Sequence, residues 1–300
     1  MKRESFGSRL GFILVSAGCA IGIGNVWKFP YICGAYGGAA FILIYLCFLV
    51  ILGIPVLVAE FAVGRGSHTS VAKCFDKLAP AGSCWKPLKF IGIIGCYMLM
   101  MFYTTVGGWM IYYCVKSLRG DFVGATPEAV TQSFSDMLGN APTMMLWMVI
   151  ICLIGFAVCF MGLQNGIEKI SKVMMSALLI IMVILAVHSV MMEGAGEGIS
   201  FYLIPDFQKI KEAGVGNVVF AALSQSFFTL SIGIGAMLIF GSYLDKSRSL
   251  TGEAVSITVL DTFVALTAGF IIIPACFSYG IQPDAGPSLS LSLCPIFLQR

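Results

Sequence analysis

Three glycines and an asparagine interrupt the first apolar stretch of the chain. Gly18, Gly22 and Gly24 fall within seven residues, and Asn25 follows directly. Each glycine costs an α-helix about 1 kcal/mol relative to alanine, so this spacing predicts a helix that breaks inside a bilayer. Backbone groups freed at that depth need partners from protein, ion or ligand, because lipid offers none. Unwound carbonyls and the side-chain oxygen of Asn25 are suitable ligands for a hard cation.

The same design recurs later in the chain. The alternative interpretation of the first stretch is close helix packing, because Gly18 and Gly22 have the spacing of the G-x-x-x-G motif. The segment from Gln225 to Ala236 (QSFFTLSIGIGA) again places two glycines one residue apart inside an apolar span, with hydroxyl side chains in place of an asparagine. Two glycine-interrupted spans in corresponding positions favour broken helices, and they indicate a site between the inverted repeats of a secondary transporter.

The elements that position these residues are apolar spans. Hydrophobic residues make up 58% of the chain and charged residues 11%, against about 25% charged residues in soluble domains. Because a membrane span needs about 20 apolar residues, the sequence predicts an all-α polytopic membrane protein with seven spans. These are expected over residues 10–32, 39–63, 88–115, 143–161, 170–192, 216–243 and 254–281.

Positive charge predicts the orientation of these spans. If the N-terminus is cytoplasmic, the cytoplasmic segments 1–9, 64–89, 162–172 and 244–253 carry twelve Lys and Arg residues, against four in the external loops. This distribution satisfies the positive-inside rule, so we expect a multi-pass protein of the plasma membrane, surrounded by lipid bilayer. No basic cluster is dense enough to indicate a nucleic-acid partner.

The remaining reactive side chains do not indicate catalysis. The eleven cysteines lie mostly inside apolar spans, where they are expected to act as small buried hydrophobes, and no Cys-x-x-Cys pair occurs. The two histidines, His68 and His188, lie far apart in the sequence, and no nucleophile stands beside a base. We therefore expect that the protein is not an enzyme.

Two motifs resemble those of a known family. The segment GIGNVWKFPY at residues 22–31 resembles the first-helix signature of the neurotransmitter:sodium symporters, and QSFFTLSIG at 225–233 resembles their sixth-helix signature. The resemblance runs from about Arg3 to about Pro287. It implies a bacterial LeuT-like amino-acid transporter, with the first inverted repeat (helices 1–5) followed by helices 6 and 7, and with helices 1 and 6 unwound at the midplane.

The resemblance also implies a domain boundary near the end of the chain. Residues 1–287 are expected to form a single transmembrane domain, whereas residues 288–300 alternate polar and apolar side chains and diverge from the family. The family continues with five further helices. We expect a chain truncated after the seventh helix, and we interpret the divergent tail as a fragment end or a frameshift.

The resemblance implies two sodium sites. The first would use the Ala20 carbonyl, Asn25, Thr229 and Asp261, together with the carboxylate of the substrate. The alternative for Asp261 is a capping or pairing role, although a carboxylate this deep in an apolar span is a functional candidate. The second site would use the carbonyls of Gly18 and Ile21, and its other ligands come from the family's eighth helix.

The implied substrate is a neutral hydrophobic or aromatic amino acid. Its carboxylate would bind the amides of Ile23 and Gly24, where a helix N-terminus favours an anion, and would accept the Tyr103 hydroxyl. Its amine would meet the carbonyls of Ala20, Phe228 and Thr229. Monoamine carriers have aspartate where Gly22 stands, so glycine leaves room for a substrate with its own carboxylate. The expected side-chain pocket is apolar, lined by Ile23, Leu99, Tyr103, Phe228, Ser231 and Ile234, with Cys19 nearby.

Gates and chloride are further implications. Phe228 resembles the outer lid, Tyr243 the inner-gate tyrosine and Arg3 the inner-gate arginine, and Lys28 replaces the outer-gate arginine. The alternative for Arg3 is a positive-inside anchor. Glu60 is interpreted as a structural hydrogen-bonding residue.

Chloride is not expected to be required. The chloride-dependent members have a serine where this chain has Ala265, and Asp261 supplies a compensating charge.

Sodium-coupled symport by alternating access is therefore the expected function. The alternative is a truncated product that does not transport, and that is degraded or associates with a full-length relative.

Overall fold

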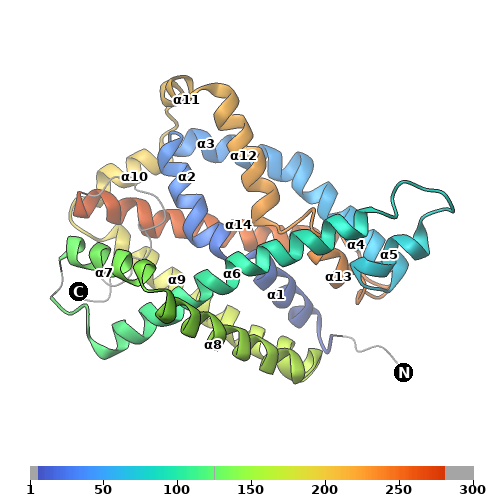
Figure 1. Ribbon diagram of the computed structural model, residues 1–300. Helices are drawn as coiled ribbons and strands as arrows, with labels where there is room; N and C mark the ends of the chain where they lie inside the picture. Colours follow the sequence, from blue (N-terminus) through green and yellow to red (C-terminus); the bar gives the residue numbers. More distant parts are fainter. Residues whose placement is uncertain (1–5, 125, 281–300) are drawn as a thin grey trace.

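The first span is broken as predicted. The computed structural model describes residues 6–124 and 126–280, and the regular elements in those ranges are all helices (Figure 1). Helix α1 (Arg9–Ala20) is followed by the π-helical η1 (Gly24–Lys28) and by α2 (Phe29–Ala35), and the two halves are bent by 53°. Ile21 ends α1 with extended backbone angles (φ −70°, ψ 107°). The prediction of a break at the glycine cluster is confirmed.

The next four spans also match the prediction closely. Their bounds are α3 (Ala39–Phe48) continuing through the π-helical η2 (Leu49–Gly53) into α4 (Ile54–Ser67), α6 (Leu88–Arg119), α8 (Ala141–Phe160), and the π-helical η3 (Leu163–Glu168) continuing into α9 (Lys169–Val190). The start of the fifth span was predicted at residue 170, and this is wrong because η3 extends it back to Leu163. Sequence reasoning assigned Glu168 to a loop, whereas the structure buries it.

The sixth span is divided and the seventh is continuous. Helix α12 (Val215–Thr229) is separated from α13 (Ala236–Gly241) by an irregular segment, and α14 (Leu250–Tyr279) forms the seventh span. Five described helices are long and apolar enough to cross a membrane individually, and the bent first pair makes a sixth. Helices α12 and α13 are shorter because the chain between them leaves the helical conformation. Gly233 and Gly235 have positive φ angles of 94° and 80°, which glycine adopts more readily than other residues.

Short helices occupy the connections between spans. They are α5 (Val71–Leu78), α7 (Pro127–Gly139), α10 (Ala195–Leu203) and α11 (Phe207–Ala213). Helix α11 begins two residues after Pro205. Asp206 caps it by accepting hydrogen bonds from the amides of Gln208 (2.9 Å) and Lys209 (3.3 Å). Arg3, the boundary at residue 287 and the tail 288–300 lie outside the described residues.

Helix α14 is the centre of the molecule. It crosses the middle of the view in Figure 1 and packs against α1, α2, α4, α9, α10 and η1. Helices α6 and α8 pack against each other at the periphery, and they leave many large apolar side chains exposed, among them Ile94, Met101, Phe156 and Phe160. Exposed apolar surface on this scale is favourable in lipid or against protein rather than in water.

Helices α4 and α13 pack with almost no space between their backbones. A Cβ added to Gly64 would overlap the carbonyl oxygen of Leu238, and one added to Gly241 would lie 2.6 Å from the Cα of Phe61. Glycine is required at both positions because the neighbouring atoms belong to backbone and cannot move independently. The inner half of the sixth span is therefore fixed against the second span.

Candidate functional site

The two helix breaks lie side by side and are joined by hydrogen bonds. The Gln225 side-chain amide donates to the carbonyl of Gly24 (2.9 Å), and the Ser231 hydroxyl donates to the carbonyl of Cys19 (3.1 Å). Ser231 has a positive φ of 51°, which places it in the irregular segment between α12 and α13. Carbonyls around the first break thus accept hydrogen bonds from side chains of the sixth span, as burial requires.

Three polar side chains from three spans meet beside the breaks. The Asn25 amide nitrogen donates to Oδ1 of Asp261 (2.8 Å) and to the Thr229 hydroxyl (3.0 Å), and that hydroxyl donates to Oδ2 of Asp261 (2.8 Å). All three residues are fully buried. The structure therefore brings together the three side chains that the sequence assigned to the first sodium site, one each from η1, α12 and α14.

The carboxylate of Asp261 is the electrostatic centre of this cluster. It lies in the buried middle of α14 and accepts hydrogen bonds from two neutral groups, and among the described residues no Lys or Arg side chain forms an ion pair with it. A buried negative charge in this setting is costly unless a cation or a proton balances it. Hydrogen-bond donors fix both of its oxygens, so the carboxylate is held in one orientation.

The backbone residues that were predicted as the other ligands lie at the end of α1 and in the break that follows it. Ala20 is the last residue of α1 and is buried, as is the extended Ile21 that follows it. Gly18 faces α9, because a Cβ added there would lie 3.3 Å from the sulfur of Met175. The amide of Gly22 donates to the Asn25 side-chain oxygen (3.3 Å), which ties the start of η1 to the break.

Two of the predicted substrate residues, Tyr103 and Phe228, lie against the glycines of the first break. A Cβ added to Gly22 would lie 3.6 Å from Cε1 and 3.7 Å from the hydroxyl of Tyr103, so the Tyr103 ring faces this glycine. A Cβ added to Gly24 would lie 2.8 Å from the Phe228 ring, which packs directly on the backbone there. Leu99 lies on α6, four residues before Tyr103, and is half-buried.

Ile234, at the second break, contacts α6. The carbonyl of Ile234 accepts a hydrogen bond from the thiol of Cys96 (3.5 Å), and the Ile234 side chain lies against Gly95. Cys19 contributes its carbonyl to Ser231, while its own side chain is exposed. Phe228, Ser231 and Ile234 therefore all lie at the break of the sixth span, as predicted.

A cavity of about 630 Å³ opens above Phe228. It is lined by Ile23, Trp27, Lys28, Tyr31, Phe102, Trp109, Phe134, Ser135, Leu138 and Phe228. The Lys28 ammonium lies 4.1 Å from the centroid of the Phe228 ring, a distance at which a cation attracts an aromatic face. The sequence proposed both residues for the outer gate but did not single out Trp27, although it lies within the first-helix signature, or Trp109, which lies in no quoted motif.

Glu60 has the structural hydrogen-bonding role that the sequence suggested. Its Oε1 accepts from the amide of Gly233 (2.6 Å) and its Oε2 from the amide of Leu238 (3.2 Å). These amides belong to the irregular segment and to α13, so one carboxylate supports the inner side of the second break. Its target could not be read from the sequence, because Glu60 and Gly233 lie in different spans.

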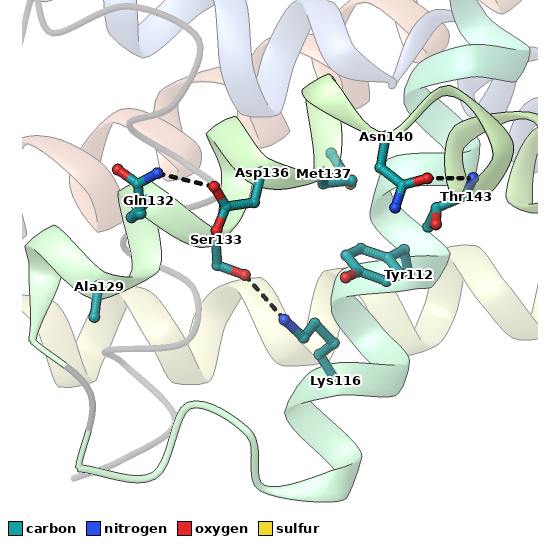
Figure 2. Close-up of a pocket in the computed structure, with 9 residues that line it drawn as sticks. All are labelled: Tyr112, Lys116, Ala129, Gln132, Ser133, Asp136, Met137, Asn140 and Thr143. Atoms are coloured by element: carbon teal, nitrogen blue, oxygen red, sulfur yellow. Dashed lines mark hydrogen bonds between the residues drawn. The ribbon is translucent and has the colours of Figure 1, made fainter.

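A second cavity, of about 440 Å³, lies between the end of α6, helix α7 and the start of α8 (Figure 2). Lys116 donates to the Ser133 hydroxyl (3.0 Å), and the Gln132 amide donates to Asp136 (2.8 Å). Four of the polar side chains that line it thus form two bonded pairs, and Asn140 accepts from the backbone amide of Thr143 (3.1 Å). None of the residues lining it belongs to the predicted site.

Comparisons of the sequence with known proteins give consistent matches to one family. The sequence model of the Sodium:neurotransmitter symporter family matches residues 3–126 and 128–280. A Bacillus subtilis protein named as an uncharacterized sodium-dependent transporter is 36% identical over 299 residues, which are 100% of this chain and 65% of the relative. The serotonin transporter of Drosophila melanogaster is 28% identical over 90% of this chain and 48% of its own length.

A solved structure has the same fold. The crystal structure of MhsT in complex with L-phenylalanine matches with a TM-score of 0.91 and 37% identity, over 99% of this chain and 66% of that chain. This chain therefore spans about two thirds of the length of the bacterial relative and of the solved structure.

Proposed function

Because this chain belongs to the sodium:neurotransmitter symporter family and has the LeuT-type fold of MhsT, we propose that it forms the central site for sodium-coupled symport of a neutral hydrophobic or aromatic amino acid. The observation that carries this proposal is the buried cluster of Asn25, Thr229 and Asp261 at the meeting point of two broken helices. Such a cluster supplies hard oxygen ligands at the position where secondary transporters bind their ions.

Sodium would bind where the Asn25 amide nitrogen now bridges Thr229 and Asp261. Rotation of this amide about its Cβ–Cγ bond would present the side-chain oxygen in place of the nitrogen. The Ala20 carbonyl, the Thr229 hydroxyl and the Asp261 carboxylate would complete the protein's share of the first site. A sodium ion would neutralise the buried charge of Asp261, which is the electrostatic reason for coupling. Gly18 and Ile21 would contribute carbonyls to a second site.

The amino acid would bind across the first break. Its carboxylate would lie at the amides of Ile23 and Gly24, within reach of the Tyr103 hydroxyl, and would also contact the sodium ion. The short distance between Gly22 and Tyr103 supports this position, because an acidic side chain at residue 22 would occupy it. The apolar side chain would lie among Leu99, Phe228, Ser231 and Ile234. MhsT was solved with L-phenylalanine, which has the proposed chemistry.

The proposal includes no chloride requirement. Ala265 is fully buried one turn after Asp261 on α14 and offers no side-chain donor to an anion. The negative charge that chloride provides in other members would come from Asp261 itself. The protein would lie in the plasma membrane with a cytoplasmic N-terminus, and its site would open alternately to the two sides.

A binding assay with labelled amino acids tests the proposal. We expect the purified protein to bind leucine, phenylalanine, tyrosine or tryptophan in sodium and to lose this binding when potassium replaces sodium, with no effect of replacing chloride by gluconate. Lysine and glutamate should not compete. Binding that is equally strong in potassium, or competition by charged amino acids alone, would contradict it.

A further inference from the structure

The start of the first helix is held by one buried carboxylate. Glu168, the last residue of η3, is 3% exposed. Its Oε2 accepts from the amide of Gly7 (2.8 Å), and its Oε1 accepts from the Ser8 hydroxyl (3.2 Å) and from the Lys172 ammonium (2.6 Å). Hydrogen bonds to a charged acceptor are stronger than those between neutral groups. Glu168 therefore connects the chain just before α1 to the fifth span through hydrogen bonds.

Helix α1 lies directly against this carboxylate. A Cβ added to Gly11 would overlap the carboxyl group of Glu168 and would lie 2.7 Å from its Cγ. Ser8 also caps α1, because its hydroxyl oxygen accepts from the amide of Gly11 (2.9 Å). The helix cap and the bond to Glu168 thus share one hydroxyl, so the first turn of α1 cannot move away while both persist.

A second carboxylate holds the same turn from another side, but more loosely. Glu253, in the first turn of α14, accepts from the Arg9 guanidinium (2.9 Å) and lies 3.6 Å from Arg248. The Arg9 side chain is 57% exposed, and a long exposed side chain can change its rotamer without moving the helix. The attachment to α14 is therefore extensible, whereas the attachment to Glu168 involves the backbone itself.

These contacts lie at the start of α1, the half of the first span that precedes the break. Phe6 adds a contact to the sixth span, because it packs on Tyr243, two residues after α13, with ring centroids 5.8 Å apart. If the proposed function is correct, the site must open on this side during each cycle, and α1 must separate from a neighbour. We propose that Glu168 is the latch of this gate: opening breaks its bonds to Gly7 and Ser8, while Arg9 keeps α1 tethered to Glu253.

Hydrogen–deuterium exchange in lipid nanodiscs tests the latch. In potassium, Glu168→Gln should accelerate amide exchange across residues 6–20 by about tenfold or more, because charged hydrogen bonds are lost. Gly11→Ala should have a similar effect by displacing the carboxylate. Glu168→Asp, which keeps the charge, should restore part of the protection. The matched control Glu253→Gln should change exchange across residues 6–20 much less, and exchange in α14 beyond its first turn should stay constant in all variants.

Two results would overturn the latch. Wild-type exchange across residues 6–20 in both Glu168→Gln and Gly11→Ala would show that Glu168 does not hold the gate. Equal acceleration by Glu253→Gln would show that the two carboxylates have the same role. A separate arm in sodium addresses the proposed function, because bound sodium should slow the exchange of the wild-type protein. Failure of that arm alone would count against sodium binding and leave the latch supported by the potassium data.

Discussion

At the scale of single residues, the proposed site depends on the lack of a side chain at Gly22 and on the buried carboxylate of Asp261. Gly22 leaves the space in front of Tyr103 open, and Asp261 places a carboxylate in the buried middle of α14. The two positions are related, because the site would accept a carboxylate from the substrate only if sodium compensates the charge of Asp261. Each position can be changed independently.

Gly22→Asp is expected to abolish amino-acid binding. The new carboxylate would stand close to that of the substrate, and like charges at such range in a poorly solvated site cost several kcal/mol. Gly22→Ala is the matched control, because its Cβ would make an ordinary contact of 3.6 Å with Tyr103 and should retain binding. Scintillation proximity binding measures both variants. Unchanged affinity in Gly22→Asp would place the substrate elsewhere.

Asp261→Ala is expected to weaken sodium binding by about tenfold or more, since a charged ligand and two hydrogen bonds are lost. Substrate affinity should fall with it at limiting sodium. Sodium titrations of the wild type and the variant, read through substrate binding, provide the measurement. An Asp261→Ala protein with an intact sodium response would assign Asp261 a structural role only.

At the scale of elements, glycine pairs allow backbones to touch. Gly64 and Gly241 let α4 contact α13, and Gly11 lets α1 contact Glu168. The break in the first span could be predicted because three glycines in seven residues oppose helix whatever surrounds them. The contacts of Gly11, Gly64 and Gly241 could not be predicted, because apolar periodicity does not identify which span packs against a given glycine. The partners of Glu60 and Gln225 were hidden for the same reason.

The local sequence also gave a wrong prediction where tertiary contacts bury a polar segment. Residues 163–168 read as a loop because they contain glutamine, asparagine and glutamate. The structure places them in η3, where Glu168 is satisfied by the start of the chain, about 160 residues away. A bond between such distant segments leaves no periodic signal. Of the ion cluster, Asn25 and Thr229 lie within the two motifs that resemble those of the family, whereas Asp261 lies outside both and was assigned through the wider resemblance.

Gly241→Ala is expected to destabilise the protein. The added methyl would collide with the backbone of Phe61, and overpacking of this kind costs roughly 1–3 kcal/mol. Gly155→Ala is the matched control, because it lies in α8 with nothing within 4 Å of an added Cβ; it should be neutral or slightly stabilising. Thermal unfolding in detergent compares the two. Equal midpoints would mean that α4 and α13 separate more easily than the structure indicates.

At the scale of the whole molecule, the described helices contain every protein ligand proposed for the first ion site, but only two of those proposed for the second, Gly18 and Ile21. The chain also spans 65% of the bacterial relative. We therefore predict that residues 1–300 by themselves do not accumulate substrate. Uptake of labelled leucine, tyrosine and tryptophan into proteoliposomes, with an inward sodium gradient and a potassium control, tests this. Sodium-driven accumulation by the 300-residue chain would refute it.

The central claim is that sodium and an amino acid share one site at the two helix breaks. The most direct test is a reciprocal titration, with substrate binding measured at several sodium concentrations and sodium binding measured at several substrate concentrations. The account predicts that each ligand tightens the other by the same factor, as thermodynamic linkage requires for ligands in contact. Substrate affinity that does not change with sodium would contradict it.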